Sequence, residues 1–167
     1  VKKLIEQAAQ QNVDLIISSA GVSVGAFDYV KEVIEADGAL DFWRVNMRPG
    51  KPVIAGRLGD AVTLGLPGNP VSAFVTAMLY LRPLIAHLCG ALDPLPQRLT
   101  APTGVDLAAN GARTEHLRAK LVDGILAPVG VNDSAMLAAL SWANALIIRP
   151  ANIGFTPAGK VIEYYPL

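Results

Sequence analysis

The segment Leu64–Ala73 constrains the fold of this chain more than any other, and it reads LGLPGNPVSA. Its first residues are apolar enough for a buried strand. Asn69 followed by Pro70 is typical of a helix start, because a proline in the first turn lacks only an N–H that would be unpaired anyway. Gly68 lets a ligand approach the backbone closely, and the free N–H groups of the first turn favour an anion such as a phosphate. A plain strand-to-helix turn without a ligand is the alternative.

The composition is that of a globular protein with small-molecule or protein partners. The chain has 167 residues, of which 52% are hydrophobic, and this is enough for a packed core. Fourteen basic and fourteen acidic residues cancel. No run of like charge indicates a nucleic-acid surface or a polybasic membrane patch. Since there is neither a secretory signal nor an apolar run of about twenty residues, we expect a cytoplasmic protein that contacts no nucleic acid and no membrane.

Cysteine and histidine are too scarce for the usual zinc sites. Cys89 is the single cysteine, which excludes an intrachain disulfide. His87 and His116 are the two histidines, and two imidazoles with one thiol do not complete a tetrahedral zinc site. We expect both histidines on the surface or at helix ends.

Strand and helix patterns alternate in the first half of the chain. We predict an α/β domain over residues 1–90, with a partial doubly wound, mostly parallel sheet and helices. The pattern predicts helices over 1–11, 28–37 and 70–88, and strands over 13–19, 42–47, 52–56 and 61–66. The apolar residues of the segment 70–88 are too dense for a fully exposed helix, so we expect it to be mostly core. Because the first helical pattern starts without a methionine or a cap, we expect a fragment of a longer protein.

The second half of the chain has short elements typical of a small β-rich domain. Proline and loop residues over 90–97 interrupt the helical pattern and mark the best domain boundary. The second domain is therefore predicted over residues 91–167. Strands are expected near 97–101, 115–121, 125–129, 145–149 and 160–164, with a small helix near 136–140.

A second loop of the anion-binding type follows the first predicted strand. The stretch Ser18–Gly25 reads SSAGVSVG, and it lies at the carboxyl end of a presumed parallel strand, where open α/β sheets place their ligands. The glycines free backbone amides and the serines add hydroxyl donors, so the loop can wrap a phosphate group. Two such loops in one small sheet predict a single crevice for a phosphorylated ligand.

Four charged residues lie close to these loops in the sequence, and each has two interpretations. Asp28 begins a predicted helix, where it caps the helix or holds Mg²⁺ against the same phosphate. Arg44, Arg48 and Lys51 surround a Pro-Gly turn. They form either a solvated edge of the sheet or the electropositive wall of an anion site.

Taken together, these motifs resemble the MoeA/gephyrin family of molybdopterin molybdenumtransferases. The resemblance covers essentially all 167 residues. The Pro-Gly-Lys and Leu-Pro-Gly-Asn-Pro motifs and the β-rich tail separate this family from MogA- and CinA-like proteins, which share the molybdopterin-binding domain but lack the tail. The matching segments are residues 19–25, 28–29, 48–52, 66–73, 115–119, 132–134 and 143–147.

The resemblance implies insertion of molybdate into the dithiolene of molybdopterin, with Mg²⁺-dependent hydrolysis of an adenylylated molybdopterin intermediate. It also implies a homodimer for the full-length protein and allows a MogA-like partner. Asp28 and Lys51 are implied as catalytic residues, and Asp28 also as the metal ligand. The substrate-binding residues that it implies are Gly21, Ser23, Gly25, Arg44, Arg48, Pro67, Gly68, Asn69, Ser72, Arg118 and Ser134.

Two departures from the family pattern accompany the resemblance. Ala20 stands where the family usually has glycine, which restricts the dihedral angles of the first loop. The family's earlier strands, with an acidic Gly-Asp-Glu turn, and its N-terminal domains have no counterpart here, so we expect an inactive fragment with an exposed sheet edge. Two other functions stay open, a MogA-like molybdopterin adenylyltransferase and a gephyrin-like scaffold that binds a partner peptide.

Overall fold

The computed structural model describes residues 2–20, 29–130 and 138–167, and the chain divides into two compact units. The first unit comprises residues 1–45 and 50–94, and the second comprises 46–49 and 95–167. The chain therefore leaves the first unit after Val45, residues 46–49 belong to the second unit, and the first unit resumes at Gly50. The single strand expected over 42–47 is wrong, because this exchange divides it between two sheets.

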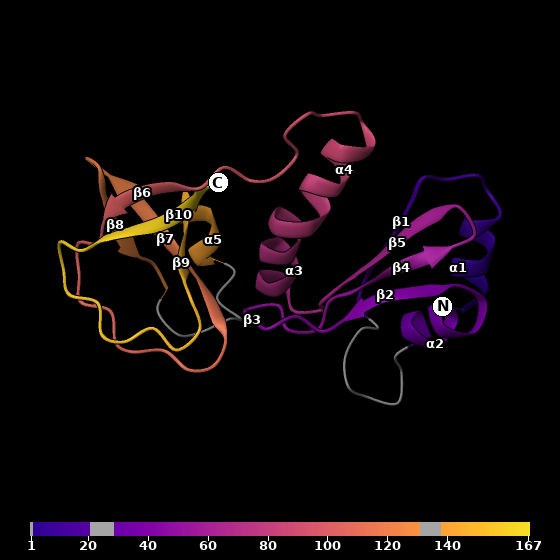
Figure 1. Cartoon of the computed structure of the whole chain (residues 1–167), viewed down its shortest axis with the longest axis horizontal. Coiled ribbons are helices and arrows are strands. Elements are labelled where there is room, and N and C mark those ends of the chain that lie inside the picture. The colour runs from indigo at the N-terminus through magenta and orange to yellow at the C-terminus, as the bar shows by residue number, and fades with distance from the viewer. Residues whose placement is uncertain (1, 21–28, 131–137) are drawn as a thin grey trace. The chain divides into compact units, whose positions relative to one another are not determined.

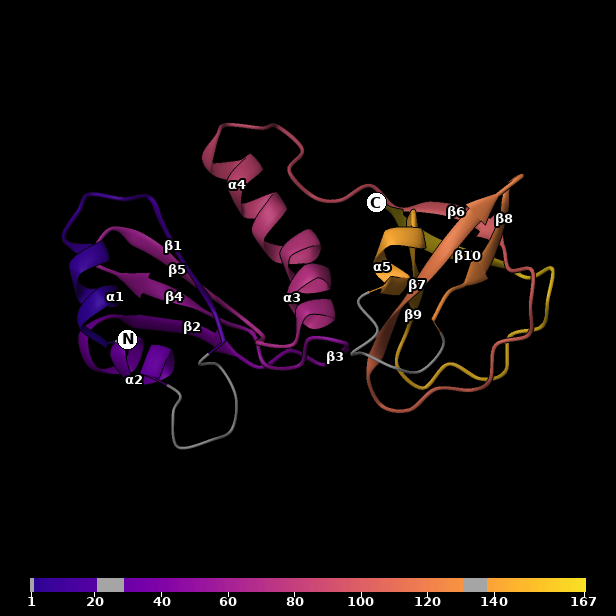
Figure 2. The ribbon, with the colours of Figure 1, turned by 180° about the vertical axis from the view of Figure 1, so that it is seen from behind.

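The helices and strands of the first unit, apart from the turn η1, can be followed by label in Figures 1 and 2. Their order along the chain agrees with the predicted alternation. They are α1 (Lys2–Ala9), β1 (Leu15–Ser19), α2 (Tyr29–Asp37), β2 (Ala39–Trp43), β4 (Ile54–Leu58), β5 (Ala61–Leu66), α3 (Pro70–Thr76), the π-helical turn η1 (Ala77–Leu81) and α4 (Arg82–Leu88).

The sheet of the first unit is mixed, with strand order β1-β5-β4-β2. Strand β1 is parallel to β5, whereas β5 pairs antiparallel with β4 and β4 antiparallel with β2. The prediction of a mostly parallel sheet is therefore wrong for the described strands. The physical reason is the short turn at Gly59 and Asp60, where Gly59 adopts a φ of 57°; so short a connection joins only antiparallel neighbours.

Helices cover both faces of this sheet. On one face, Ile54 and Leu58 of β4 pack in a buried cluster with Ile5 of α1 and with Val33 and Ile34 of α2. On the opposite face, a second cluster joins strand and helix side chains: Val53, Leu64 and Leu66 contact Ala73, Ala77, Tyr80 and Leu84. The unit thus has a layered α/β/α arrangement, which a sheet with two apolar faces requires.

The helix over residues 70–88 runs without interruption through α3, η1 and α4. Several of its apolar side chains are substantially exposed, among them Phe74, Ile85 and Leu88, so the expectation of a mostly buried helix is wrong. It is also long and apolar enough to span a membrane by length and composition alone, with a hydropathy of 1.4, contrary to the expected absence of such a run. Because this helix packs against Leu64 and Leu66 of β5, we interpret it as part of a folded domain and not as a membrane-spanning helix.

The second unit is β-rich, as predicted. Its elements are β3 (Met47–Arg48), β6 (Leu99–Pro102), β7 (Thr114–Val122), β8 (Ile125–Pro128), α5 (Ala138–Trp142), β9 (Ala145–Arg149) and β10 (Val161–Pro166). The strand order is β3-β7-β9-β10-β6, and β8 pairs with residues 119–122 at the end of β7. Among the described strands of this second sheet, β3 and β7 form the parallel pair, and the other strand pairs are antiparallel. The sheet curls enough for the Gly104 N–H to donate to the Leu126 carbonyl at 2.7 Å, around a core that includes Ala119, Leu126 and Ile147.

Candidate functional site

The described ends of the two predicted anion loops lie side by side in the first unit. Ser19 and Leu66 are register partners at the ends of the parallel strands β1 and β5. The Ala20 N–H donates to the Leu66 carbonyl at 3.0 Å. A Cβ built on Gly68 would lie 3.1 Å from the Cβ of Ala20. The structure therefore brings both loops to the carboxyl edge of the sheet, where open α/β sheets bind ligands. Gly21, Ser23 and Gly25 lie outside the described residues.

The start of α3 has the predicted helix cap. Asn69 has extended dihedral angles, φ −70° and ψ 124°, and its Oδ1 accepts from the Ser72 N–H at 3.1 Å and from the Ser72 hydroxyl at 3.3 Å. Pro70 occupies the first turn. Pro67 and Ser72 are buried, whereas Gly68 is exposed and Asn69 is half-buried. Among the predicted residues of this loop, Gly68 and Asn69 are thus the ones that a ligand can reach first.

Ala20 adopts a backbone conformation that glycine normally provides. Its φ is 74°, in the left-handed region, which costs an L-residue with a Cβ about 1–2 kcal/mol. Ala20 therefore adopts the dihedral angle of the glycine that the family usually has at this position, and it does so at the cost of backbone strain.

Two of the three predicted cations, Arg44 and Lys51, belong to the first unit. The Arg44 guanidinium carbon lies 3.9 Å from the centroid of the Trp43 ring, and the Lys31 Nζ lies 4.6 Å from it. The electron-rich face of the indole ring attracts both cations. Arg44 itself has a φ of 70°, and Lys51 is exposed. Trp43 was missed at the sequence level, because nothing in its pattern showed that two cations would contact it.

Arg48, the third predicted cation, belongs to the second unit and forms an ion pair there. Its Nη1 lies 3.6 Å from Glu115 Oε1, and Arg149 Nη1 lies 3.7 Å from Glu115 Oε2. We call Arg48, Glu115 and Arg149 the charge ladder. Because Arg44 and Lys51 lie in the first unit, the single electropositive wall stays a prediction.

The two predicted residues of the tail have different outcomes. Arg118 is buried on β7 and donates from Nη2 to the Gly130 carbonyl at 2.8 Å. Ser134 lies outside the described residues, as does Asp28. Among the residues that the structure does describe, no group of three or more histidine, cysteine, aspartate or glutamate side chains could hold a metal ion.

His116 is buried near the start of β7, so the expected position on the surface or at a helix end is wrong. The ring stacks on that of Tyr165, with centroids 6.2 Å apart and an interplanar angle of 19°. Burial, assisted by the charge of Arg98, lowers the pKa of His116 to about 4. His87 is exposed in the last turn of α4, as expected.

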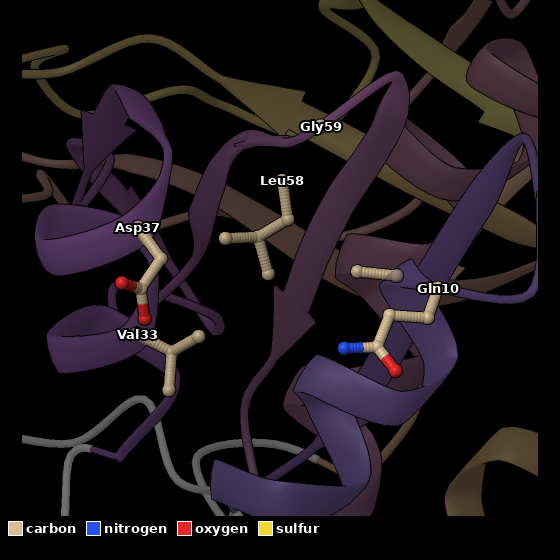
Figure 3. A pocket seen from close by; sticks show the side chains of 6 residues that line it. Gln10, Val33, Asp37, Leu58 and Gly59 are labelled. Atoms are coloured by element: carbon tan, nitrogen blue, oxygen red, sulfur yellow. The ribbon is translucent and has the colours of Figure 1, made fainter.

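A cavity of about 360 Å³ opens between α1, α2 and the β4–β5 turn. Gln10 and Asp37 lie on either side of Leu58 and Gly59 at its mouth (Figure 3). The β4–β5 turn precedes β5, whereas both anion loops follow β1 and β5, so the cavity lies at the other end of the sheet. None of the predicted site residues that the structure describes lines it.

Comparison with known proteins decides which family has this combination. Residues 1–87 match the family described as the probable molybdopterin binding domain, and residues 100–167 match the MoeA C-terminal region, domain IV. The chain belongs to the MoeA family. It is 35% identical over 165 residues to the molybdopterin molybdenumtransferase of Haemophilus influenzae, covering 95% of this chain and 41% of that protein. It is 36% identical over 165 residues to the molybdenum cofactor synthesis protein cinnamon of Drosophila melanogaster, covering 92% of this chain and 27% of that protein.

Two solved structures of molybdenum cofactor or molybdopterin biosynthesis proteins have the same fold. The chain superposes on the molybdopterin biosynthesis MoeA protein of Pyrococcus horikosii with a TM-score of 0.81 at 24% identity, over 99% of this chain and 40% of that one. For a molybdenum cofactor biosynthesis protein of Pyrococcus furiosus, the TM-score is 0.75 at 21% identity, with 99% of this chain and 53% of that one covered. The chain spans about two fifths of the length of the molybdenumtransferases of Haemophilus influenzae and Staphylococcus aureus.

Proposed function

We propose that this MoeA-family chain forms part of a protein that inserts molybdate into molybdopterin, acting on an adenylylated molybdopterin. The observation that carries the proposal is the meeting of two anion-type loops at one sheet edge, through Ala20 and Gly68. Molybdate and phosphate are both tetrahedral oxyanions, which suit backbone amides and guanidinium groups. The match of both halves to MoeA-type domains favours this function over that of a MogA-like adenylyltransferase.

The proposed ligand contacts follow from the two loops and the cations. The loop around Gly68 and Asn69, with Pro67 and Ser72 behind it, would hold the pterin phosphate or the nucleotide together with Gly21, Ser23 and Gly25. Exposed Lys51 would act beside the reacting oxyanion as a catalytic cation, and Arg44, Arg48, Arg118 and Ser134 would bind substrate. Each cation would stabilise negative charge, which is most effective where water is excluded.

The proposal assigns Mg²⁺ to Asp28, and that assignment depends on the sequence. Magnesium is normally bound by one or two carboxylates together with substrate oxygens, so one aspartate beside a bound phosphate is chemically sufficient. The described residues contain no cluster of metal-binding side chains, so Asp28 is the carboxylate to which we assign the ion. Dimerisation, a cytoplasmic location and completion of a doubly wound sheet by further strands belong to the same proposal.

The small molecule that the purified protein retains is a direct test of the proposed function. Purified protein is denatured, and the released small molecules are identified by mass spectrometry, in the wild type and in Gly68→Val. We expect a pterin in the wild type and much less in the variant, because a side chain at position 68 closes the approach to the amides. A groove without pterin that binds peptide would support the scaffold function instead, and equal pterin in both proteins would overturn the proposed site.

Turnover is the second arm of the test. Residues 1–167 are assayed for hydrolysis of adenylylated molybdopterin with Mg²⁺ and molybdate, beside the intact Haemophilus influenzae relative. We expect weak oxyanion binding without turnover, since one carboxylate in a solvent-open site lacks the low-dielectric surroundings of a closed one. A rate within about tenfold of the relative's, a barrier difference of about 1.4 kcal/mol, would contradict this expectation.

A further inference from the structure

We propose that Glu115 is a positioning residue, which fixes the guanidinium of Arg48 for oxyanion binding, and that buried Arg149 fixes Glu115 in turn. The inference rests on the proposed function in one respect, namely that Arg48 contacts the oxyanion. It adds two residues, Glu115 and Arg149, that act through Arg48 without touching the substrate. All three lie in the second unit.

The backbone register creates the charge ladder. Arg48 of β3 is the register partner of Glu115 on β7, and Glu115 is the register partner of Arg149 on β9. Directly opposed residues on neighbouring strands place their side chains on the same face of the sheet and within reach of each other. The three side chains therefore form one row across three strands, with the carboxylate between two guanidinium groups.

Burial increases along this row from Arg48 to Arg149. The exposed fraction of the side chain is 53% for Arg48, 16% for Glu115 and 6% for Arg149. Each carboxylate oxygen of Glu115 faces a different arginine, Oε1 towards Arg48 and Oε2 towards Arg149. The inner end of the row is therefore anchored, while the outer end presents a guanidinium to solvent, where a ligand can reach it.

Arg149 restricts where the Glu115 carboxylate can lie. The described structure gives its Nη2 a long hydrogen bond to the Gly154 carbonyl, at 3.4 Å, and its buried Nε no partner. A buried guanidinium requires a nearby carboxylate, because an uncompensated buried charge is strongly destabilising. Glu115 is thus held by Arg149, and its second oxygen is left to orient Arg48.

The charge count distinguishes positioning from simple neutralisation. Two guanidinium groups and one carboxylate leave the ladder with a net charge of +1, available for an oxyanion at Arg48. If Glu115 only lowered the local positive charge, its removal would strengthen oxyanion binding through Coulomb attraction. If Glu115 positions Arg48, its removal weakens binding despite the added positive charge. The two roles therefore predict changes of opposite sign.

The test measures the dissociation constant for molybdate in the full chain by calorimetry, with Glu115→Gln as the variant. We expect affinity to fall by about tenfold, as for the loss of one well-oriented hydrogen bond to a charged group. In the Arg48→Ala background, the same Glu115→Gln change should have no further effect. The matched control is Glu163→Gln, which breaks the exposed pair of Glu163 with Arg98 on the same sheet, 3.7 Å apart, and should leave molybdate affinity unchanged.

A second variant keeps the test valid if Glu115→Gln destabilises the unit. Glu115→Asp retains the charge beside Arg149 but shortens the side chain, so it should fold and still weaken molybdate binding. Unchanged or tighter binding in a folded Glu115 variant, with Arg48→Ala weakened, would overturn the positioning role alone. If Arg48→Ala binds molybdate as tightly as the wild type, Arg48 does not contact the oxyanion, and the positioning role is overturned. Pterin retention would still report on the proposed function.

Discussion

Ala20 and Gly68 meet where the two anion loops converge, and a Cβ added at position 68 would lie 3.1 Å from the Ala20 Cβ. That distance is shorter than an ordinary contact between two carbon atoms, about 3.5–4.0 Å. A side chain at position 68 would therefore require the two loops to move apart by a few tenths of an ångström, and it would also narrow the access of a ligand. Ala20, in contrast, holds a positive φ of 74° at the cost of backbone strain.

Gly68→Ala should lower the free energy of unfolding by about 1 kcal/mol, the lower end of the cost of overpacking. Ala20→Gly should remove both the contact and the strain at position 20, so it should rescue Gly68→Ala. Urea denaturation of the two single variants and the double variant checks this coupling. Additive effects of the two changes would show that the residues do not meet in solution.

Asn69 allows the helix cap to be separated from the anion site. Asn69→Ala should lower the free energy of unfolding by about 1 kcal/mol, because the first turn of α3 loses its cap. Asn69→Asp should preserve stability, since aspartate caps equally well, but its charge should repel molybdate and raise the dissociation constant. Denaturation curves and calorimetric titrations give the two readouts. Undiminished molybdate binding by Asn69→Asp would place the anion elsewhere.

Asp28 can be examined in the same manner in the intact protein. Asp28→Asn should change stability little, because asparagine and aspartate are comparable N-caps, yet it removes the negative charge that Mg²⁺ requires. We therefore expect Mg²⁺-dependent turnover to collapse while the melting temperature stays the same. Normal turnover would show that Asp28 is a cap only.

His116 should make stability depend on pH below neutrality. Its pKa is about 4 in the folded chain against an ordinary value of 6.5, so between these pH values the unfolded chain binds more protons. The free energy of unfolding should then decrease as the pH falls from 6.5 towards 4, by at most about 1.4 kcal/mol per pH unit, and the full contribution is present above pH 6.5. Denaturation at a series of pH values measures the slope.

Two variants assign that slope to the buried ring. His116→Phe keeps an aromatic ring against Tyr165 but cannot be protonated, so it should flatten the dependence over this range. His87→Gln, at the exposed end of α4, should leave the slope as it is in the wild type. A slope that persists in His116→Phe would assign the pH dependence to other groups.

Asn144 closes one end of the β7–β9 pair with its side chain. Its Oδ1 accepts from the Leu121 N–H at 2.7 Å, and its Nδ2 donates to the Leu121 carbonyl at 3.1 Å. Asn144→Ala removes both hydrogen bonds and should cost about 1 kcal/mol, since both are exposed to solvent. Asn144→Asp keeps the acceptor alone and should have an intermediate effect on the denaturation midpoint. Equal stability of all three proteins would contradict this role.

The sequence by itself determined the elements and the local chemistry of the helix start. Apart from the segment 42–47, the alternation of apolar segments with turn residues located the helices and strands to within a few residues, because these patterns depend on near neighbours. Asn69 and Pro70 predicted the capped start of α3 for the same reason, since a cap is satisfied within one turn. The MoeA family could also be inferred from such local motifs.

Only the tertiary structure decided which distant residues meet. The exchange of residues 46–49 into the second unit, the mixed sheet and the burial of His116 all depend on strand pairing between segments far apart in the chain. The charge ladder depends on the same pairing, because Arg48, Glu115 and Arg149 become neighbours only when three strands adopt one register. A one-residue shift would turn Glu115 to the opposite face. That register is fixed by the packing of whole sheet faces, which no local pattern contains.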